Sequence, residues 1–136
     1  PATTTSLGSG CSGSAGPVVL SVASQPWIGG DFQATVTGIG PLAIAVALLG
    51  FGVPAIPLSL LHPAAGPDCY QLASADVAQL LLPVAGTATS RFAMPTGVAF
   101  VGVTLQTQVV QVEVDFSLNI TGISSSNGLS LTIGVF

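Results

Sequence analysis

The chain has 136 residues, of which only 4% are charged, and its formal net charge at pH 7 is −4. Ordinary soluble domains carry about 25% charged residues, so uncharged polar groups, glycans or burial in an assembly must keep this surface in solution. With a single cationic side chain, Arg91, the chain cannot neutralise a track of phosphates or bind an anionic membrane surface. Nucleic acid is therefore excluded as an expected partner.

Length and hydropathy predict one domain with no membrane insertion. The longest apolar run, 42–49, lies between Pro41 and Gly50, whereas a membrane-spanning helix needs about 20 residues. We expect an N-terminal segment at 1–16 and a folded domain at 17–136. The chain begins at Pro1, which favours removal of a leader and an extracellular or cell-surface location.

The N-terminal segment is polar at first and then rich in glycine and serine. Residues 1–6 read PATTTS, and we expect them to pair with a sheet edge of the same chain or of another subunit. Cys11 and Cys69 are the two cysteines, and a secreted context predicts one disulfide, within a chain or between subunits. Two free buried thiols are the alternative.

Short alternating or apolar stretches predict strands along the middle of the chain. The run 42–51 is apolar on both faces, which predicts a buried central strand whose second face needs its own cover. The stretch 74–82 is ambiguous, because Ser74 or Asp76 could cap one helical turn. The remaining expected strands are 18–23, 31–37, 69–72, 86–94 and 98–109.

The stretch 110–121 has the clearest alternation in the chain. Six apolar residues occupy its even positions, and polar residues, including Glu113 and Asp115, occupy its odd positions. Read as one strand, it would be roughly 40 Å long and would need a second layer over its apolar face. The sequence therefore predicts an all-β fold, an antiparallel β-sandwich of Ig-like or jelly-roll-like type with one disulfide.

Two details of strand register follow from the same pattern. Apolar residues occupy odd positions up to Val109 and even positions from Val110, so we expect a β-bulge, a sheet crossing or a tight corner at 108–111. The pair Asn127-Gly128 is typical of a hairpin turn, after which 129–136 should pair antiparallel with 110–121.

No catalytic motif is present, so an enzyme is not expected and no cofactor is implied. The single histidine, His62, has no cluster of partners in the sequence and is interpreted as a loop residue. Glu113 and Asp115 would share a wet face, which favours solvation over acid–base chemistry, with Arg91 as a candidate ion-pair partner. A calcium site would need several of the five acidic residues to converge, namely Asp31, Asp68, Asp76, Glu113 and Asp115.

Other residues suggest surface chemistry. Asn119-Ile120-Thr121 is an N-glycosylation sequon, and the threonines after Pro1 resemble an O-glycosylated patch, formed by Thr3, Thr4 and Thr5. Trp27 and Tyr70 are candidates for stacking on a sugar, although packing at the end of the sandwich is the simpler interpretation for Trp27.

Scattered glycines, turns and the cysteine pair form a wider pattern. It comprises Gly8-x-Gly10-Cys11-x-Gly13-Ser14-x-Gly16-Pro17, Pro26-x-x-Gly29, Gly66-Pro67-x-Cys69, Gly102 with Gln108, and Ser126-Asn127-Gly128-Leu129-x-Leu131-x-Ile133-Gly134. This pattern resembles an uncharacterised β-sandwich module at the C-terminal ends of many secreted bacterial proteins. The resemblance implies a secreted, disulfide-bonded surface module of unknown chemistry. The lack of charge and of a larger upstream region favours an independent subunit.

Two functions remain as hypotheses. The first is an extracellular structural protein that self-assembles into a filament or surface layer through strand edges, because no lysine is present to protect those edges. The second is a carbohydrate-binding or adhesion module of a secreted bacterial protein. The expected partners are accordingly further copies of the chain and, in either case, glycans.

Overall fold

The computed structural model describes residues 1–66 and 68–135, and the named strand pairs in this part are antiparallel. Pro67 of the Gly66–Cys69 motif and Phe136 of the expected last strand lie outside the described residues. The strands are β1 (Thr3–Leu7), β2 (Ser12–Gly13), β3 (Gly16–Pro17), β4 (Val19–Ser24), β5 (Asp31–Thr37), β6 (Ala43–Gly50), β7 (Ile56–Pro57), β8 (Tyr70–Gln71), β9 (Val77–Leu81), β10 (Ala88–Ala93), β11 (Thr104–Val114), β12 (Ile120–Ser125) and β13 (Gly128–Thr132). Two short 3-10 helices are η1 (Leu58–Leu60) and η2 (Val98–Phe100).

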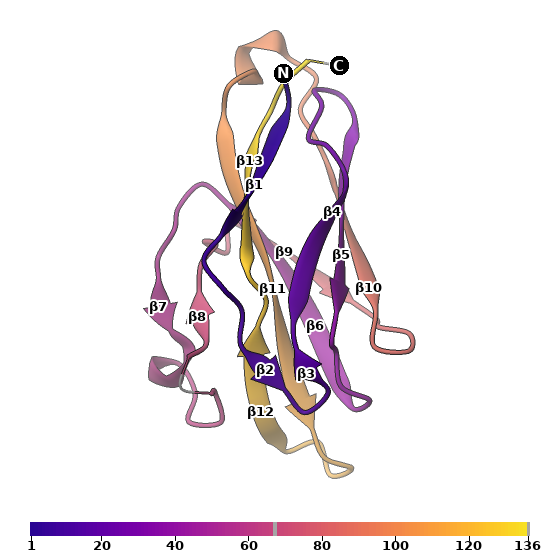
Figure 1. Ribbon diagram of the computed structural model, residues 1–136, viewed down its shortest axis with the longest axis vertical. Helices are drawn as coiled ribbons and strands as arrows, with labels where there is room; N and C mark the ends of the chain where they lie inside the picture. Colours follow the sequence, from indigo (N-terminus) through magenta and orange to yellow (C-terminus); the bar gives the residue numbers. More distant parts are fainter. Residues whose placement is uncertain (67, 136) are drawn as a thin grey trace.

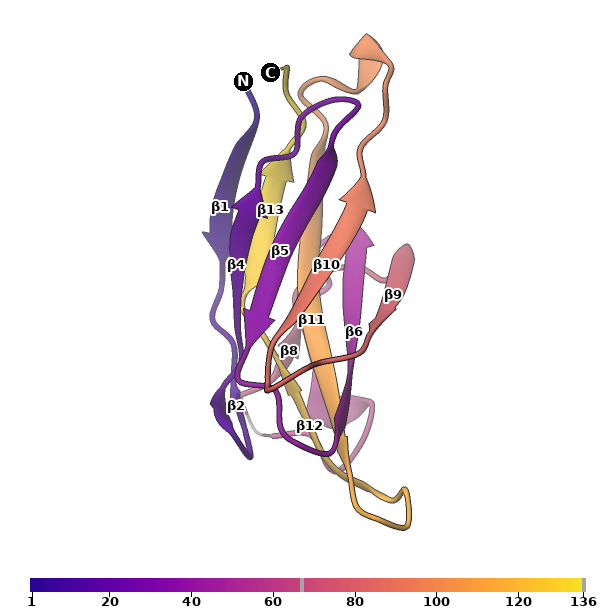
Figure 2. The same ribbon diagram turned by 90° about the vertical axis from the view of Figure 1, so that its right-hand side faces the viewer.

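Two sheets face each other and form the predicted β-sandwich. The larger sheet has the order β1-β13-β11-β6-β9, and β12 pairs with a different part of β11 from β13. The smaller sheet has the order β10-β5-β4. Figure 1 shows the two layers from the side, and Figure 2 shows the smaller sheet in front of the larger one. In Figure 2, β1 and β9 lie at opposite edges of the larger sheet.

The core lies between the two sheets because their strands alternate as the sequence predicts. On β5, Phe32, Ala34 and Val36 are fully buried, and the intervening residues are more exposed. On β10, the predicted inward residues are buried and Arg91 points outward. The larger sheet contributes aliphatic side chains to the same cluster, among them Ala45, Ala47, Leu49, Leu105, Val109, Leu129 and Leu131.

A long connection from β6 to β9, residues 51–76, covers part of the outer face of the larger sheet. It carries β7, η1 and β8, which lie in Figure 1 on the side opposite the smaller sheet. The disulfide between Cys11 and Cys69 ties this connection to the segment before β2, with a Cα–Cα distance of 5.2 Å. The predicted cover for the second face of β6 is thus supplied in part by the chain itself.

The expectation of one strand over 110–121 is wrong. The chain turns at 115–119, and β11 and β12 form a hairpin around this turn. The cause is Asp115, whose carboxylate oxygen Oδ1 accepts the backbone N–H groups of Ser117 and Asn119, each at 2.9 Å. An aspartate that satisfies backbone groups in this way favours a turn over a strand. Phe116 and Leu118, expected in the dry layer, are therefore 93% and 80% exposed.

The expected bulge at 108–111 is also wrong, because β11 pairs with β6 without a register shift from Gln106 to Glu113. The shift lies between Glu113 and Val114. The apolar residues can change from odd to even positions without a bulge, because both faces of β11 are covered. Val109 faces the sandwich core, whereas Gln108 is buried under the 51–76 connection. The Gln108 side-chain oxygen accepts the Leu72 N–H, and its side-chain NH2 group donates to the Tyr70 carbonyl.

Asn127-Gly128 does not form a hairpin turn. β12 and β13 both pair with β11, along Val110–Val114 and Thr104–Thr107, so 120–132 follows one edge of β11 with a break at Ser126 and Asn127. Elsewhere, 77–81 is a strand and the helical alternative at 74–82 is wrong, whereas 98–100 is a 3-10 helix ahead of β11.

Candidate assembly surface

β9 has an exposed apolar edge. It is the last strand of the larger sheet, and within residues 1–66 and 68–135 no strand pairs with its outer side. The exposed fractions of Val77, Leu80 and the following Leu82 are 48%, 62% and 79%. β9 contains no charged residue or proline, which are the usual devices that protect a strand edge.

At each edge of the smaller sheet, one side-chain amide from the larger sheet binds the backbone of one strand residue. The Asn127 side chain accepts from the Leu20 N–H at 2.9 Å and donates to the Leu20 carbonyl at 3.0 Å, so it pairs with β4 as one strand residue would. On the other side, Gln79 of β9 accepts from the Arg91 N–H at 3.2 Å and donates to the Arg91 carbonyl at 3.3 Å. Both amides cross from the larger sheet and satisfy backbone groups that another chain could otherwise bind.

The free edge of β12 is covered by the 51–76 connection and the N-terminal segment. The Ile123 N–H donates to the Ala64 carbonyl, and the Gly66 N–H donates to the Ile123 carbonyl. The Cys11 N–H donates to the Ser125 carbonyl at 2.9 Å, next to the disulfide. β1 is the other outer edge of the larger sheet, and it consists mainly of threonine and serine, whereas β9 is mainly aliphatic.

An apolar groove lies beside β9 on the outer face of the larger sheet. Its volume is about 280 Å³, and its lining includes Val46, Leu48, Leu58, Leu61, Val110 and Val112. Leu61 and the nearby Leu60 are 62% and 76% exposed, so the 51–76 connection covers this face only in part. The groove and the β9 edge together expose aliphatic surface with no charged side chain among the lining residues.

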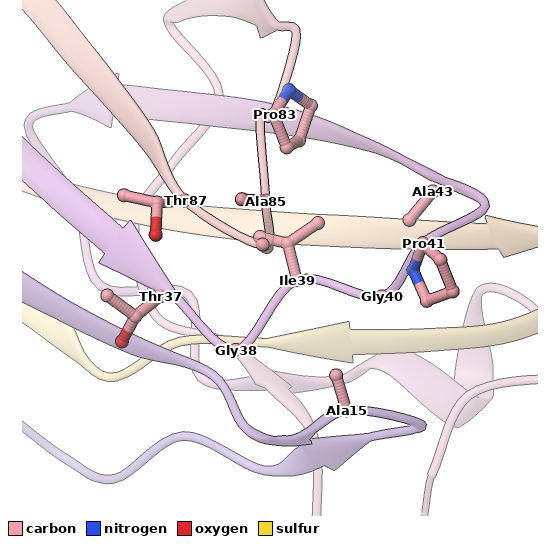
Figure 3. Close-up of a pocket in the computed structure, with 11 residues that line it drawn as sticks. Ala15, Thr37, Gly38, Ile39, Gly40, Pro41, Ala43, Pro83, Ala85 and Thr87 are labelled. Carbon is pink, nitrogen blue, oxygen red and sulfur yellow. The ribbon is translucent and has the colours of Figure 1, made fainter.

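A cavity of about 680 Å³ opens at the end of the sandwich shown in Figure 3. The β5–β6 connection and the turn between β9 and β10 form its walls, with Ile39, Pro41 and Pro83 among the lining residues. Its side-chain hydroxyls come from Thr37 and Thr87, and the lining holds no titratable side chain. No titratable side chain in the lining is therefore available to activate these hydroxyls.

Glu113 and Asp115 occupy different places. Glu113 accepts the Ser14 N–H at 2.9 Å and faces the β2–β3 hairpin in a polar cleft of about 330 Å³. Gly13 of this hairpin leaves no room for a side chain, since an added Cβ would lie 2.5 Å from Glu113 Oε1. Asp115 instead organises the 115–119 turn. Neither carboxylate pairs with Arg91 in the described contacts, in contrast to the sequence hypothesis.

Two exposed carboxylates have perturbed acidity. The pKa of Asp76 is lowered from its ordinary value by the Phe51 N–H and then by the Ser74 hydroxyl, which donates at 2.9 Å. The pKa of Asp115 is lowered chiefly by the Asn119 N–H, with a smaller contribution from the Asn119 side chain. In both cases the hydrogen bonds favour the charged form, and both groups stabilise turns or loops.

The acidic residues do not converge on a cation site. Among the described residues, no three histidine, cysteine, aspartate or glutamate side chains gather in a metal-binding group. Asp68 lies beside the disulfide, Asp76 precedes β9, and Asp31 begins β5. His62 lies in the 51–76 connection, where its Nδ1 accepts the Ala64 N–H at 3.0 Å.

The candidate sugar-stacking residues are separated. Trp27 pairs with Gly134 in an isolated parallel bridge near the end of the sandwich that carries both termini. Tyr70 is 39% exposed on β8, where it pairs with Pro57. The two rings therefore belong to different parts of the surface and do not form one platform.

The candidate glycosylation residues are on the surface. Asn119 and Thr121 are exposed at the end of the 115–119 turn, which projects beyond the sandwich at the lower end of Figures 1 and 2. Thr3 and Thr5 are exposed on β1, whereas the Thr4 hydroxyl donates to the Gln25 side-chain oxygen at 2.8 Å. The 1–16 segment pairs through β1 with β13 of the same chain.

The sequence patterns did not identify Gln79 and Asn127 as links between the two sheets, and they did not identify β9 as an exposed edge. Amides that bind backbone across two sheets leave no motif, because their partners are far apart in the chain. In the part of the chain that the structure describes, no helix has the length and apolar character to cross a membrane. Comparisons with protein-family models, with curated proteins and with solved structures find no match for this chain.

Proposed function

We propose that this chain is an extracellular structural protein that assembles with copies of itself into a filament or surface layer through strand edges. The observation that carries the proposal is the contrast between edges. Amides bind one residue on the edge of β4 and one on the edge of β10, and loops pair with β12, whereas β9 presents an aliphatic strand with no such backbone partner among the described residues. An uncovered strand edge is a template for a strand of another chain.

Charge supports self-association. Only 4% of the residues are charged, so few charged side chains are available to protect a strand edge. Low charge also removes the usual means of keeping an aliphatic edge apart from its neighbours. The apolar groove beside β9 extends the same surface.

The disulfide and the resemblance noted above support a secreted location for this assembly. Disulfides persist in oxidising compartments and are rare in reducing ones. Glycans on Asn119 or on the exposed threonines of β1 would solubilise surfaces away from β9, because the 115–119 turn and β1 are distant from it in the sheet order.

Carbohydrate binding is the second candidate function. The observation that favours it is the cleft beside Glu113, whose lining includes the hydroxyl residues Ser12, Ser14, Thr121 and Ser124. One carboxylate among hydroxyls and glycine backbone suits a ligand rich in hydroxyl groups, although no aromatic ring lines the cleft.

Electron microscopy of the purified protein near neutral pH tests the proposal. We expect regular filaments or sheets from the wild type. Leu80→Lys should raise the concentration needed for assembly at least about tenfold, because a lysine on an edge must lose its hydration when another strand approaches.

Val98→Lys is the matched control, since Val98 is 81% exposed and lies on η2, outside β9. It should assemble as the wild type does. Dispersed monomers of the wild type at high concentration would overturn the proposal, and glycan binding by such monomers would favour the second candidate.

A further inference from the structure

The outer N–H and C=O groups of β9 can pair with a partner strand along its whole length. Its five residues run from Val77 to Leu81, bounded by Asp76 and Pro83, and their inner side already pairs with β6. The outer N–H and C=O groups therefore form a regular row. Antiparallel pairs are slightly more stable per residue than parallel pairs, so an antiparallel partner is preferred.

We propose that the partner is β9 of a second copy, paired antiparallel about a two-fold axis that passes midway between the two Gln79 residues. This inference rests on the proposed function and names one contact of the assembly. A two-fold contact closes on itself, so extension into a filament requires a second surface. The axis is normal to the larger sheet, so the two sheets join into one continuous sheet. A two-fold contact of this kind uses the same surface on both subunits.

The sequence of β9 is complementary to itself in this arrangement. Val77 lies opposite the partner's Leu81, and Ala78 lies opposite the partner's Leu80, so apolar residues meet apolar residues on both faces. Side chains opposite each other in a sheet must lie on the same face, so the register can shift only in steps of two residues. Any such shift leaves part of the five-residue strand unpaired.

The carboxylate next to β9 does not oppose this contact. Asp76 is the acidic residue next to the strand, and its carboxylate is held by the Phe51 N–H and the Ser74 hydroxyl. The proposed axis places the two Asp76 residues at opposite ends of the paired strands, roughly 20 Å apart. Salt screens charges at this distance, because the Debye length at physiological ionic strength is about 8 Å.

The contact also places aliphatic side chains of the two copies next to each other. Leu80 and Leu82 are 62% and 79% exposed, and Ile44 on the neighbouring β6 is 44% exposed. Pairing joins the two outer faces into one wider apolar face. A contact made by one short strand belongs to the smaller interfaces, below about 1,200 Å² in total, so the dimer should dissociate on dilution.

A pair of cysteine variants measures the register directly. In the proposed dimer, residue 78 faces residue 80 of the other subunit with a Cα distance of about 5 Å, which suits a disulfide. Residue 78 lies roughly 8 Å from the same residue of its partner, as residue 80 does, and this is too far for a disulfide. The two native cysteines are already bonded to each other, so the wild type supplies no free thiol.

Ala78→Cys and Leu80→Cys proteins are prepared separately, checked by circular dichroism, and oxidised gently alone and as an equal mixture. We expect cross-linked dimer in the mixture at least about fivefold above either protein alone, because only the mixed pair lies within disulfide range. The readout is intact mass under non-reducing conditions.

Equal cross-linking in all three samples, or none in the mixture, would overturn the two-fold contact. Filaments of the wild type in that case would leave the proposed function standing with a different contact. Cross-linking in the mixture without filaments of the wild type would support the dimer and contradict the proposed filament.

Discussion

Ala85 has a backbone conformation that L-residues rarely adopt. Its φ is 54° and that of Gly86 is 79°, and these two residues form the turn between Val84 and Thr87. Positive φ at both central positions is typical of the type I′ turn, for which Asn-Gly is the preferred pair. Alanine at the first position therefore stores strain that asparagine would relieve.

We expect Ala85→Asn to raise the free energy of unfolding by about 0.5–1 kcal/mol, because asparagine tolerates the left-handed region. Chemical denaturation measures the change. Ala15→Asn is the control, since Ala15 is an exposed alanine in the β2–β3 turn and its φ is not positive. An equal gain in both variants would contradict the strain argument.

At the scale of elements, the 115–119 turn decides where β11 ends. Asp115 accepts backbone N–H groups, and Leu118 adopts a φ of 64° to complete the turn. The hydrogen bonds favour the carboxylate over the carboxylic acid. The turn thus depends on a negative charge at a site where alternation alone predicts a strand.

This dependence gives a pH effect with a definite sign. The pKa of Asp115 is lowered from 3.8 in the folded state, so its contribution to stability is full above 3.8 and is lost as the pH falls through the lower value. The pKa of Asp76 is also lowered in the folded state, so its contribution to stability is likewise lost at acidic pH. The free energy of unfolding should therefore fall at acidic pH.

Asp115→Asn should reduce this fall, because the amide oxygen still accepts the N–H groups and no longer titrates. Urea denaturation at neutral pH and at about pH 3 gives the comparison with the wild type. Asp31→Asn, which removes an exposed carboxyl at the start of β5, is the control. An unchanged pH dependence in Asp115→Asn would contradict the role of this carboxylate.

At the scale of the whole molecule, two amides and one disulfide link parts that are far apart in the sequence. Asn127 joins the larger sheet to β4, Gln79 joins it to β10, and the disulfide joins the 51–76 connection to the N-terminal segment. These links close the sides of the sandwich without charged residues. They also leave β9 as the uncovered aliphatic edge.

Asn127→Asp tests such a link with little change of shape. The carboxylate still accepts the Leu20 N–H but cannot donate to the Leu20 carbonyl, so we expect a loss of about 1–3 kcal/mol in the free energy of unfolding at neutral pH. Protonation restores a donor, so the deficit relative to the wild type should shrink at acidic pH. A constant deficit would show that the lost donor is not its cause.

The sequence by itself determined the all-β class, the inward residues of β5 and β10, the central position of β6 and the pairing of Cys11 with Cys69 as one of the stated options. These features follow from local alternation and from the count of cysteines, which depend on neighbours in the chain. Exchange of the N-terminal strand between subunits stays a prediction, and so does glycosylation of the candidate residues.

Tertiary structure decided the features that depend on distant partners. Alternation continued through 115–119, but the carboxylate of Asp115 made a turn there, and the parity change at Val109 and Val110 reflected two covered faces. The β9 edge could not be identified from the sequence, because an edge is a strand without a neighbour and the neighbours are set by the whole fold. The same holds for Gln79 and Asn127, whose function as links requires two sheets to face each other.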